Sequence, residues 1–182
     1  MSQKLTPEFL AERRTRILDA ARWCFLNFGF ARTSLEDIAR RAVISRTLLY
    51  RMFKDKEDIF IQVFDDWILS RVQSANQAAR QAGTRRARLQ RVCQRLALDS
   101  WSEWASAPMA GEFQDVYERL RPKVAWKHRE GTLEPVAQVL GDADIARVFL
   151  LSLEGLFVDR PPLDVLVKRI GILVDRFAGD VM

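Results

Sequence analysis

The sequence contains little histidine, cysteine, glycine or proline, and these shortages exclude several kinds of protein. One His and two Cys in 182 residues rule out a disulfide framework and a metal site built from several such ligands. Eight Gly and six Pro are few for this length and favour long helices over a turn-rich β fold. No glycine-rich phosphate loop and no partnered nucleophile is visible, so we expect no cofactor and no enzymatic activity.

Long apolar runs are missing as well. The longest strongly apolar stretch, Val148 to Leu153, ends at Glu154 and is too short to span a bilayer. The first residues lack the apolar segment of a signal peptide. We therefore expect no membrane partner and a location in the cytoplasm. Because 48% of the residues are hydrophobic and 29% are charged, the chain has the composition of a globular protein with a core.

Positive charge is concentrated in the first third of the chain. Residues 1–56 contain twelve Lys and Arg against six Asp and Glu, whereas residues 57–182 contain seventeen against eighteen. A polyanion bound to the first third would release counterions, and the remainder has no electrostatic reason to bind one. On charge alone, nucleic acid binding and an ordinary solvated basic face are equally good explanations.

The spacing of apolar residues predicts one longer and two short helices in residues 7–53. The first covers about Pro7 to Phe28 and ends before Gly29, a plausible C-cap. Its apolar face, which includes a buried and reduced cysteine, consists of Ile17, Ala20, Ala21, Cys24, Phe25 and Phe28.

Capping signals mark the two short helices. Thr33 with Glu36, or alternatively Ser34 with Asp37, has the spacing of a capping box. The β-branched pair 43–44 ends that helix, and Ser45 caps the next one, Arg46 to about Met52.

Two short helices laid against a longer one form a three-helix DNA-reading unit. The need for packing explains Leu49 and Phe53 on the inner side of the last short helix. It does not explain the residues gathered on the opposite side, which are Arg46, Thr47, Leu48, Tyr50 and Arg51.

The run from Thr33 to Ala42 continues through Ser45-Arg46 and Leu49-Tyr50 to the segment 53–57. With these residues, the stretch 13–64 closely resembles the TetR family of bacterial repressors. The resemblance implies an all-α fold with a helix-turn-helix DNA-binding domain in residues 1–56, its motif at about 33–53. Residues 57–182 would form a helical bundle that binds a small-molecule effector and mediates formation of a homodimer.

Three positions depart from the family pattern. Val43 stands where Gly usually follows the Ala, Thr47 where a small Gly or Pro is common, and Met52 where His is usual. A left-handed valine would cost ~1–2 kcal/mol, so we expect a slightly altered turn instead.

The resemblance assigns roles to the outer residues of the motif. Arg46, Thr47, Leu48 and Arg51 are the candidates for contacts with base edges, because Arg can chelate guanine and the methyl groups can touch thymine. The candidates for phosphate contacts are Tyr50, Lys56, Thr33 and Ser34. In the first helix, Arg13, Arg14 and Arg16 could reach the DNA backbone or could equally form a solvated face.

Beyond residue 55, the expected N-cap of the next helix, long helices are predicted over 56–82 and 85–107. Pro108, Gly111, Pro122, Gly131 and Pro135 are expected to divide the middle into short helices. The last two helices should cover about 142–158 and 162–178. Around the junction of the helices predicted at 56–82 and 85–107, the arginines of residues 80–95 are interpreted as a solvated surface and not as a second polyanion site.

Aromatic bulk in the middle of the chain could form an apolar effector pocket or simply a core. The candidates are Trp101, Trp104, Met109, Phe113, Tyr117 and Trp126. Polar anchors could come from Glu103, Arg119 and His128, although His128 is more plausibly exposed.

The last two helices are more apolar than a single core-facing stripe requires, which favours a symmetric dimer. The expected interface residues are Phe149, Leu153, Leu156, Leu166, Ile170, Leu173 and Phe177, with Gly155 allowing close approach.

The leading hypothesis is a DNA-binding transcriptional regulator that leaves a near-palindromic operator when it binds a small apolar or aromatic effector. Two alternatives remain at this stage. The three departures from the family pattern are compatible with an adaptor that has lost DNA binding and works by protein contacts. An enzyme hidden in the aromatic bundle would need a polar constellation there.

Overall fold

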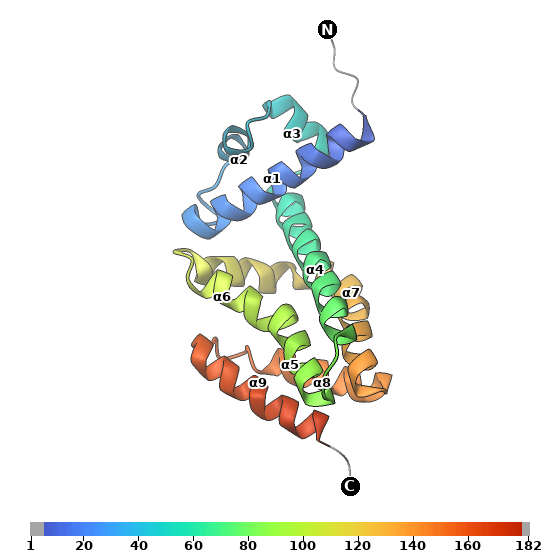
Figure 1. The fold of residues 1–182 in the computed structure, drawn as a ribbon. Coiled ribbons are helices and arrows are strands. Elements are labelled where there is room, and N and C mark those ends of the chain that lie inside the picture. The colour runs from blue at the N-terminus through green and yellow to red at the C-terminus, as the bar shows by residue number, and fades with distance from the viewer. Residues whose placement is uncertain (1–5, 180–182) are drawn as a thin grey trace. The chain divides into compact units, whose positions relative to one another are not determined.

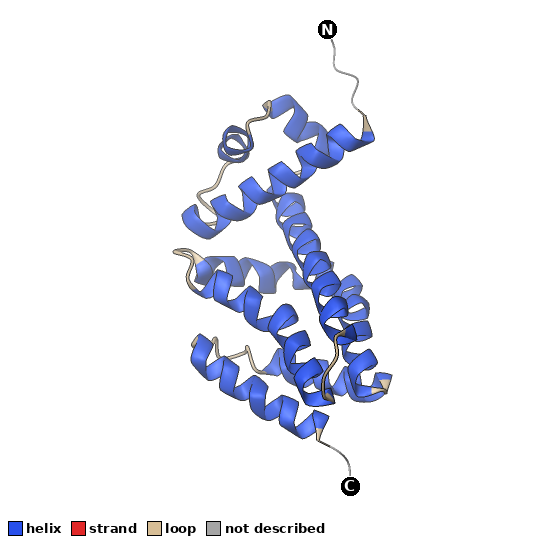
Figure 2. Ribbon diagram, viewed as in Figure 1, coloured by secondary structure: helices blue, strands red, loops and turns tan. Residues whose placement is uncertain are grey.

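The computed structural model describes residues 6–179, with only the backbone for residues 121–130, and every element in this part of the chain is a helix (Figures 1 and 2). The elements are α1 (Pro7–Phe28), α2 (Leu35–Ala42), α3 (Arg46–Met52), α4 (Lys56–Arg80), α5 (Arg85–Cys93), a π-helical turn η1 (Gln94–Leu98), α6 (Asp99–Ala105), α7 (Ala110–Leu140), α8 (Ala143–Gly155) and α9 (Leu163–Ala178). The all-α prediction is confirmed. Across residues 6–179 the helices are too short or too polar to span a membrane.

The chain forms two compact units. The N-terminal unit comprises Met1–Asp66 and Ala107–Val124, and the C-terminal unit comprises Trp67–Ser106 and Ala125–Met182. The chain therefore passes between the units within α4, at the 106–107 link and within α7. This division differs from the expected one at residue 56, because the first part of α7 belongs with the N-terminal helices.

Local side-chain chemistry sets the ends of α1 as the sequence predicts. The Thr6 hydroxyl accepts a hydrogen bond from the N–H of Phe9 at 3.2 Å, and Pro7 occupies the first turn, where its missing N–H has no cost. At the other end, Gly29 adopts φ 87° and donates its N–H to the Phe25 carbonyl. Cys24 is buried, as expected for its position on the apolar face.

The core of the N-terminal unit contains a chain of aromatic rings. Phe60 lies at the centre, with ring centroids 5.4 Å from Phe25, 5.4 Å from Phe64 and 5.0 Å from Phe113. Phe64 also stacks on Tyr117 at 4.5 Å. Because residues 113 and 117 come from α7, this helix supplies part of the core beneath the helix-turn-helix.

Helix α7 contradicts the prediction of short helices in the middle of the chain. It runs without a break for 31 residues and includes Gly111, Pro122, Gly131 and Pro135. A proline inside a helix loses one hydrogen bond and costs about 3 kcal/mol, which tertiary packing can offset. In the last turns of α7 that packing is present, since Pro135, Val136 and the apolar residues that follow are buried.

The core of the C-terminal unit is built from small and aliphatic residues. Ala75, Ala78 and Ala79 of α4 are buried together with residues from α5 to α9. Cys93 is among the residues with no exposure, and burial raises the pKa of its thiol to about 12. This cysteine is therefore a small apolar core residue and remains protonated.

Arginines of α5 close the C-terminal end of α4. Arg88 donates to the carbonyl of Ala79 at 2.8 Å, and Arg91 donates to that of Ala82 at 2.9 Å. Arg86 pairs with Asp175 of α9. The interpretation of this arginine run as a solvated face was therefore wrong for Arg88 and Arg91, whose guanidinium groups satisfy carbonyls that the end of a helix leaves open.

Candidate nucleic-acid interface

Ser34 starts α2 through a reciprocal capping box with Asp37. The Ser34 hydroxyl accepts from the Asp37 N–H at 3.1 Å, and the Asp37 carboxylate accepts from the Ser34 N–H at 3.0 Å. The hydrogen bond from the Ser34 hydroxyl lowers the pKa of Asp37. Of the two capping boxes that the sequence allowed, the one shifted to residue 34 is therefore formed. Ser34 remains exposed at the helix N-terminus.

Thr33 does not reach the surface. Its side chain is 1% exposed, and its hydroxyl donates to the Gly29 carbonyl at 2.6 Å. The expectation that this hydroxyl contacts a phosphate was therefore wrong for this conformation, because the group is already used inside the loop between α1 and α2.

The turn between α2 and α3 contains a valine in a strained backbone conformation. Val43 adopts φ 55° and ψ 51°, the left-handed conformation, and its N–H donates to carbonyls of Ala39 and Arg40. The expectation of an altered turn was wrong: the turn keeps the left-handed geometry that suits glycine. A β-branched residue there costs about 1–2 kcal/mol. The rest of the motif must stabilise the turn by more than this amount.

Helix α3 has one buried and one exposed side. Ser45 caps it, accepting the Leu48 N–H at 3.2 Å. Leu49 and Phe53 are buried at 1% and 4% exposure. On the opposite side Arg46, Thr47, Tyr50 and Arg51 are exposed and Leu48 is half-buried. The structure thus brings all five predicted outer residues of this helix to the surface.

Among the residues that the structure describes, Arg46 has one polar partner, through an ion pair between its Nη1 and the Glu36 carboxylate of α2 at 3.3 Å. Both side chains are more than half exposed, so the pair is worth little in water and can open for a stronger acceptor. Arg51 has no hydrogen bond or ion pair to any residue that the structure describes. Both guanidinium groups are therefore available to an external acceptor.

Lys56 faces inward at the loop between α1 and α2. Its ammonium group donates to the carbonyls of Phe30 at 2.6 Å and Thr33 at 2.9 Å, and lies 3.4 Å from that of Ala31. It also sits 4.5 Å from the centroid of the Phe30 ring. Desolvation by burial lowers the pKa of this lysine, with the Glu112 carboxylate acting in the opposite direction. A direct phosphate contact by its ammonium group is therefore not available in this conformation.

Helix α7 holds the same loop from the other side. The Glu112 carboxylate accepts from the Ala31 N–H at 2.7 Å, and the Met109 N–H donates to the Leu26 carbonyl at 3.0 Å. A Cβ atom at Gly29 would overlap the Glu112 carboxylate, so a larger residue would displace that side chain, and the positive φ also favours glycine. Sequence reasoning named Met109 only as a pocket candidate and missed Glu112, since nothing local links either residue to a loop so distant in the chain.

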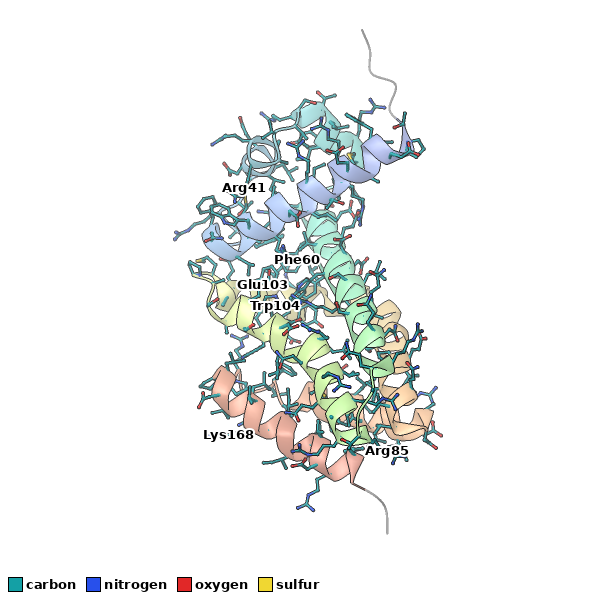
Figure 3. The ribbon with its side chains drawn as sticks, in the orientation of Figure 1. Arg41, Phe60, Arg85, Glu103, Trp104 and Lys168 are labelled. Carbon is teal, nitrogen blue, oxygen red and sulfur yellow. The ribbon has the colours of Figure 1, made fainter. Side chains whose placement is uncertain are left out.

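The basic residues of α1 are only partly free. Arg14 donates to Gln62 and pairs with Asp66, both at 3.2 Å, so it ties α1 to α4. Arg13 lies over the Phe9 ring at 4.8 Å. On α2, the Arg41 guanidinium stacks 3.4 Å above the centroid of the exposed Trp23 ring (Figure 3). Among these cations, Arg14 has a structural role that the sequence left undecided.

The aromatic residues expected to form one pocket belong to two different units. Phe113 and Tyr117 pack in the N-terminal unit with Phe60 and Phe64. Trp101 and Trp104 belong to the C-terminal unit. The side chains of Trp126 and His128 lie outside the described residues. Each of these four residues has an aromatic neighbour within its own unit, and their grouping into one effector pocket stays a prediction.

Contacts of the two tryptophans support the packing interpretation. The buried Trp101 donates its indole N–H to the Pro161 carbonyl at 3.0 Å, and Trp104 lies 4.3 Å from the Trp67 ring (Figure 3). Two of the suggested polar anchors form ion pairs. Glu103 pairs with Arg71 at 3.1 Å, and Arg119 pairs with Glu57 at 2.7 Å.

The expected dimer residues are mostly core residues of the chain itself. Phe149, Leu153, Leu166 and Ile170 are buried, and Leu156, Leu173 and Phe177 pack against the same core. The predicted residues therefore serve the core of the single chain, and their role in a dimer stays a prediction; both helices are apolar on a second side as well. The other side remains exposed, at Ile145, Val148, Leu151, Leu163, Val167 and Ile172.

Residues 17–63 match the family model described as bacterial regulatory proteins, tetR family. The chain is 31% identical over 67 residues to the uncharacterized HTH-type transcriptional regulator YhgD of Bacillus subtilis, covering 37% of this chain and 35% of that protein. It is 33% identical over 57 residues to the HTH-type transcriptional repressor Rv1474c of Mycobacterium tuberculosis, covering 31% and 30%. The matched segment spans about a third of these relatives' length.

The fold matches solved structures over nearly the whole chain. SmeT, the repressor of the Stenotrophomonas maltophilia multidrug efflux pump SmeDEF, has a TM-score of 0.65 and 21% identity, covering 92% of this chain and 91% of that chain. A SmeT–triclosan complex has a TM-score of 0.61 and 19% identity, covering 93% of each chain. At this level of identity, the likeness shows a shared fold.

Proposed function

Because residues 17–63 match the tetR family of bacterial regulatory proteins, we propose that the protein is a DNA-binding transcriptional regulator, most simply a repressor. It would act as a symmetric dimer on a near-palindromic operator. The observation that carries this proposal is the exposed face of α3. Arg46, Thr47, Tyr50 and Arg51 are exposed while Leu49 on the opposite side is 1% exposed.

That face fits a major groove by chemistry as well as by position. Arg46 and Arg51 offer bidentate donors for guanine, and Thr47 and Leu48 offer methyl groups for thymine. Tyr50 and Ser34 are the remaining candidates for phosphate contacts, together with the backbone N–H groups at the start of α2. Lys56 and Thr33 support the loop that positions α2.

Dimer formation follows from the exposed apolar side of α8 and α9. Val148, Leu151 and Ile172 are 55%, 60% and 63% exposed, a costly arrangement for an isolated chain in water. A second copy of the chain is the simplest partner for this apolar side, because the same face of two copies can pair across a two-fold axis. Such a dimer would present two α3 helices to half-sites about 34–36 Å apart.

Control by a small molecule is the further part of the proposal. The effector would bind in the C-terminal unit and reduce the affinity for DNA. A protein of the same fold, SmeT, has been solved in complex with a small molecule, triclosan, which supports this part of the proposal by analogy. The effect of the effector would have to travel along α4 or α7, since these helices contribute residues to both units.

The test is a selection of binding sequences from random duplex DNA with the purified protein. We expect an enriched near-palindrome whose binding weakens steeply with salt. Absence of an enriched sequence, with retained helical content, would overturn DNA regulation and favour an adaptor that works by protein contacts.

A separate experiment tests the dimer. Val148→Asp with Leu151→Asp should convert a dimer into a monomer in analytical ultracentrifugation, because both charges would be buried at the two-fold. The matched control is Arg147→Asp, at an exposed polar position of α8. A wild-type protein that sediments as a monomer at micromolar concentration would contradict this interface.

A further inference from the structure

A polar cavity lies in the C-terminal unit between the second half of α4 and the α5–η1 segment. Its volume is about 330 Å³, and it is lined by Ser74, Gln77, Ala78, Gln81, Arg91, Gln94 and Arg95. None of these residues belongs to the proposed DNA interface or to the expected aromatic pocket. Its size is at the lower end of ligand sites, about 300–1,000 Å³, so any ligand would be small.

The lining is rich in donors and carries net positive charge. It contains two guanidinium groups, three primary amides and one hydroxyl, and no carboxylate. An oxyanion would find charge-assisted hydrogen bonds here, whereas a cation or an apolar molecule would not.

Arg95 is held in position and keeps donors to spare. Its Nη1 donates to the Asp99 carboxylate at 2.9 Å, and the Gln94 amide donates to the same carboxylate at 2.7 Å. Burial alone would raise the pKa of Asp99, but these hydrogen bonds and the nearby cations lower it below its ordinary value. The carboxylate therefore stays ionised and orients the guanidinium, which has further N–H groups for a ligand.

Arg91 supports a ligand site more strongly than Arg95, because one of its donors lacks a partner in the described part of the chain. Its Nη2 donates to the Ala82 carbonyl at 2.9 Å, while its Nε is buried without a hydrogen-bond partner in the described part of the chain. Arg91 also has no ion pair with any described residue. Unsatisfied buried donors are uncommon, and this one belongs to a side chain that lines the cavity.

The backbone beside the cavity is unusual as well. Gln94 and Arg95 begin the π-helical turn η1, which interrupts an otherwise continuous run of α-helix from α5 to α6. Such turns are rare and occur frequently at functional sites. The first two residues of this turn, Gln94 and Arg95, line the cavity.

We propose that this cavity binds a small organic anion. A carboxylate or phosphate group would accept hydrogen bonds from Arg91 and Arg95, and polar substituents would contact Ser74, Gln77 and Gln94. The ligand would join α4 to α5, and α4 is one of the helices shared by both units. As the effector of the regulator, a role that rests on the function proposed above, the ligand would be polar and acidic instead of aromatic.

The experiment is isothermal titration of the full-length protein with citrate and, in parallel, with glycerol 3-phosphate, at an ionic strength fixed with chloride. We expect saturable binding of at least one probe with one site per chain. The two probes distinguish a carboxylate ligand from a phosphate ligand.

Charge variants at Gln77 locate the site, because this side chain lines the cavity and is exposed on α4. Gln77→Glu should weaken binding at least tenfold, and Gln77→Lys should preserve or strengthen it. Gln90→Glu, an equal charge change at an exposed α5 position outside the lining, should have no effect. No saturable binding of either probe, or equal binding by Gln77→Glu and Gln90→Glu, would overturn the site.

The titration contains no DNA, so it is independent of the regulatory function. Failure to select an operator would overturn that function and leave an anion-binding site in place. Loss of anion binding with operator binding intact would overturn this site alone.

Discussion

Two helices that contain arginine, α3 and α5, use this side chain in opposite ways. In α5 the guanidinium groups of Arg86 and Arg88 act on the chain itself, through Asp175 and the Ala79 carbonyl. In α3 Arg51 has no partner among the described residues, and Arg46 has only an exposed pair with Glu36. The number of positive charges does not distinguish the two helices. They differ in whether the guanidinium groups donate to other groups of the chain or remain available to an external acceptor.

The largest expected effect separates these two groups directly. Arg46→Ala combined with Arg51→Ala should reduce specific DNA affinity about a hundredfold or more, since each good arginine–base pair is worth about 1–3 kcal/mol. The measurement is fluorescence anisotropy with the selected operator. The matched double variant Arg80→Ala with Arg85→Ala, at exposed positions at the end of α4 and the start of α5, should bind like the wild type. An equal loss of DNA affinity in both double variants would contradict the difference between the arginines of α3 and those of α5.

The next effect concerns Lys56, a cation that donates to its own chain although it lies beside the helices proposed to read DNA. Lys56→Met should lower the free energy of unfolding by about 2 kcal/mol, because carbonyls of the α1–α2 loop lose a charged donor. Urea denaturation followed by circular dichroism measures it. Lys54→Met, at an exposed neighbouring position, is the control and should change stability little. An unchanged Lys56→Met protein would mean that the loop does not need the ammonium group.

A smaller effect is expected at the end of α4. Arg88→Met keeps the apolar stem but removes the donor to the Ala79 carbonyl, and should destabilise the protein by about 1–2 kcal/mol. Its affinity for the selected operator, measured on folded protein, should not change. Arg85→Met, which removes an exposed guanidinium from the same helix, should alter neither quantity. A loss of DNA affinity in Arg88→Met would show that the inward arginines also contribute to binding.

The smallest effect tests the backbone without changing any charge. Val43→Gly should stabilise the protein by about 1 kcal/mol, because glycine adopts φ 55° without the steric penalty of a β-branched residue. Thermal unfolding is the measurement, and Val43→Ala, which keeps a Cβ atom, should gain less. A destabilised glycine variant would show that the flexibility of the unfolded chain outweighs the relief of strain.

Local chemistry made the helix-turn-helix readable from the sequence. The Ser34 and Ser45 caps, Gly29 and the apolar spacing place α1 to α3 within a residue or two of their observed limits. These signals act over three or four residues, the range over which hydrogen bonds of a helix end are satisfied. The exposed side of α3 could be predicted because the apolar residues of its buried side were recognisable in the sequence.

What could not be read from the sequence depends on distant partners. Nothing near Lys56 shows that its ammonium group meets three carbonyls, and nothing near Glu112 points to Ala31. For a related reason, the sequence did not show which apolar side of α8 and α9 packs in the core of the chain. A helix that is apolar on two sides does not indicate which side faces its own chain. Proline was misleading in α7 because burial elsewhere in the helix outweighed a local penalty.

The discontinuous N-terminal unit has a practical consequence for dissecting the protein. A fragment ending at residue 66 would retain the whole helix-turn-helix but would lack Phe113 and the Glu112 carboxylate that contacts Ala31. Phe60 and Phe64 would then face water, and the fragment should aggregate or unfold instead of binding DNA. Chimaeras that exchange DNA-binding heads between regulators of this architecture should accordingly carry residues 107–124 with the head, and not only the contiguous start of the chain.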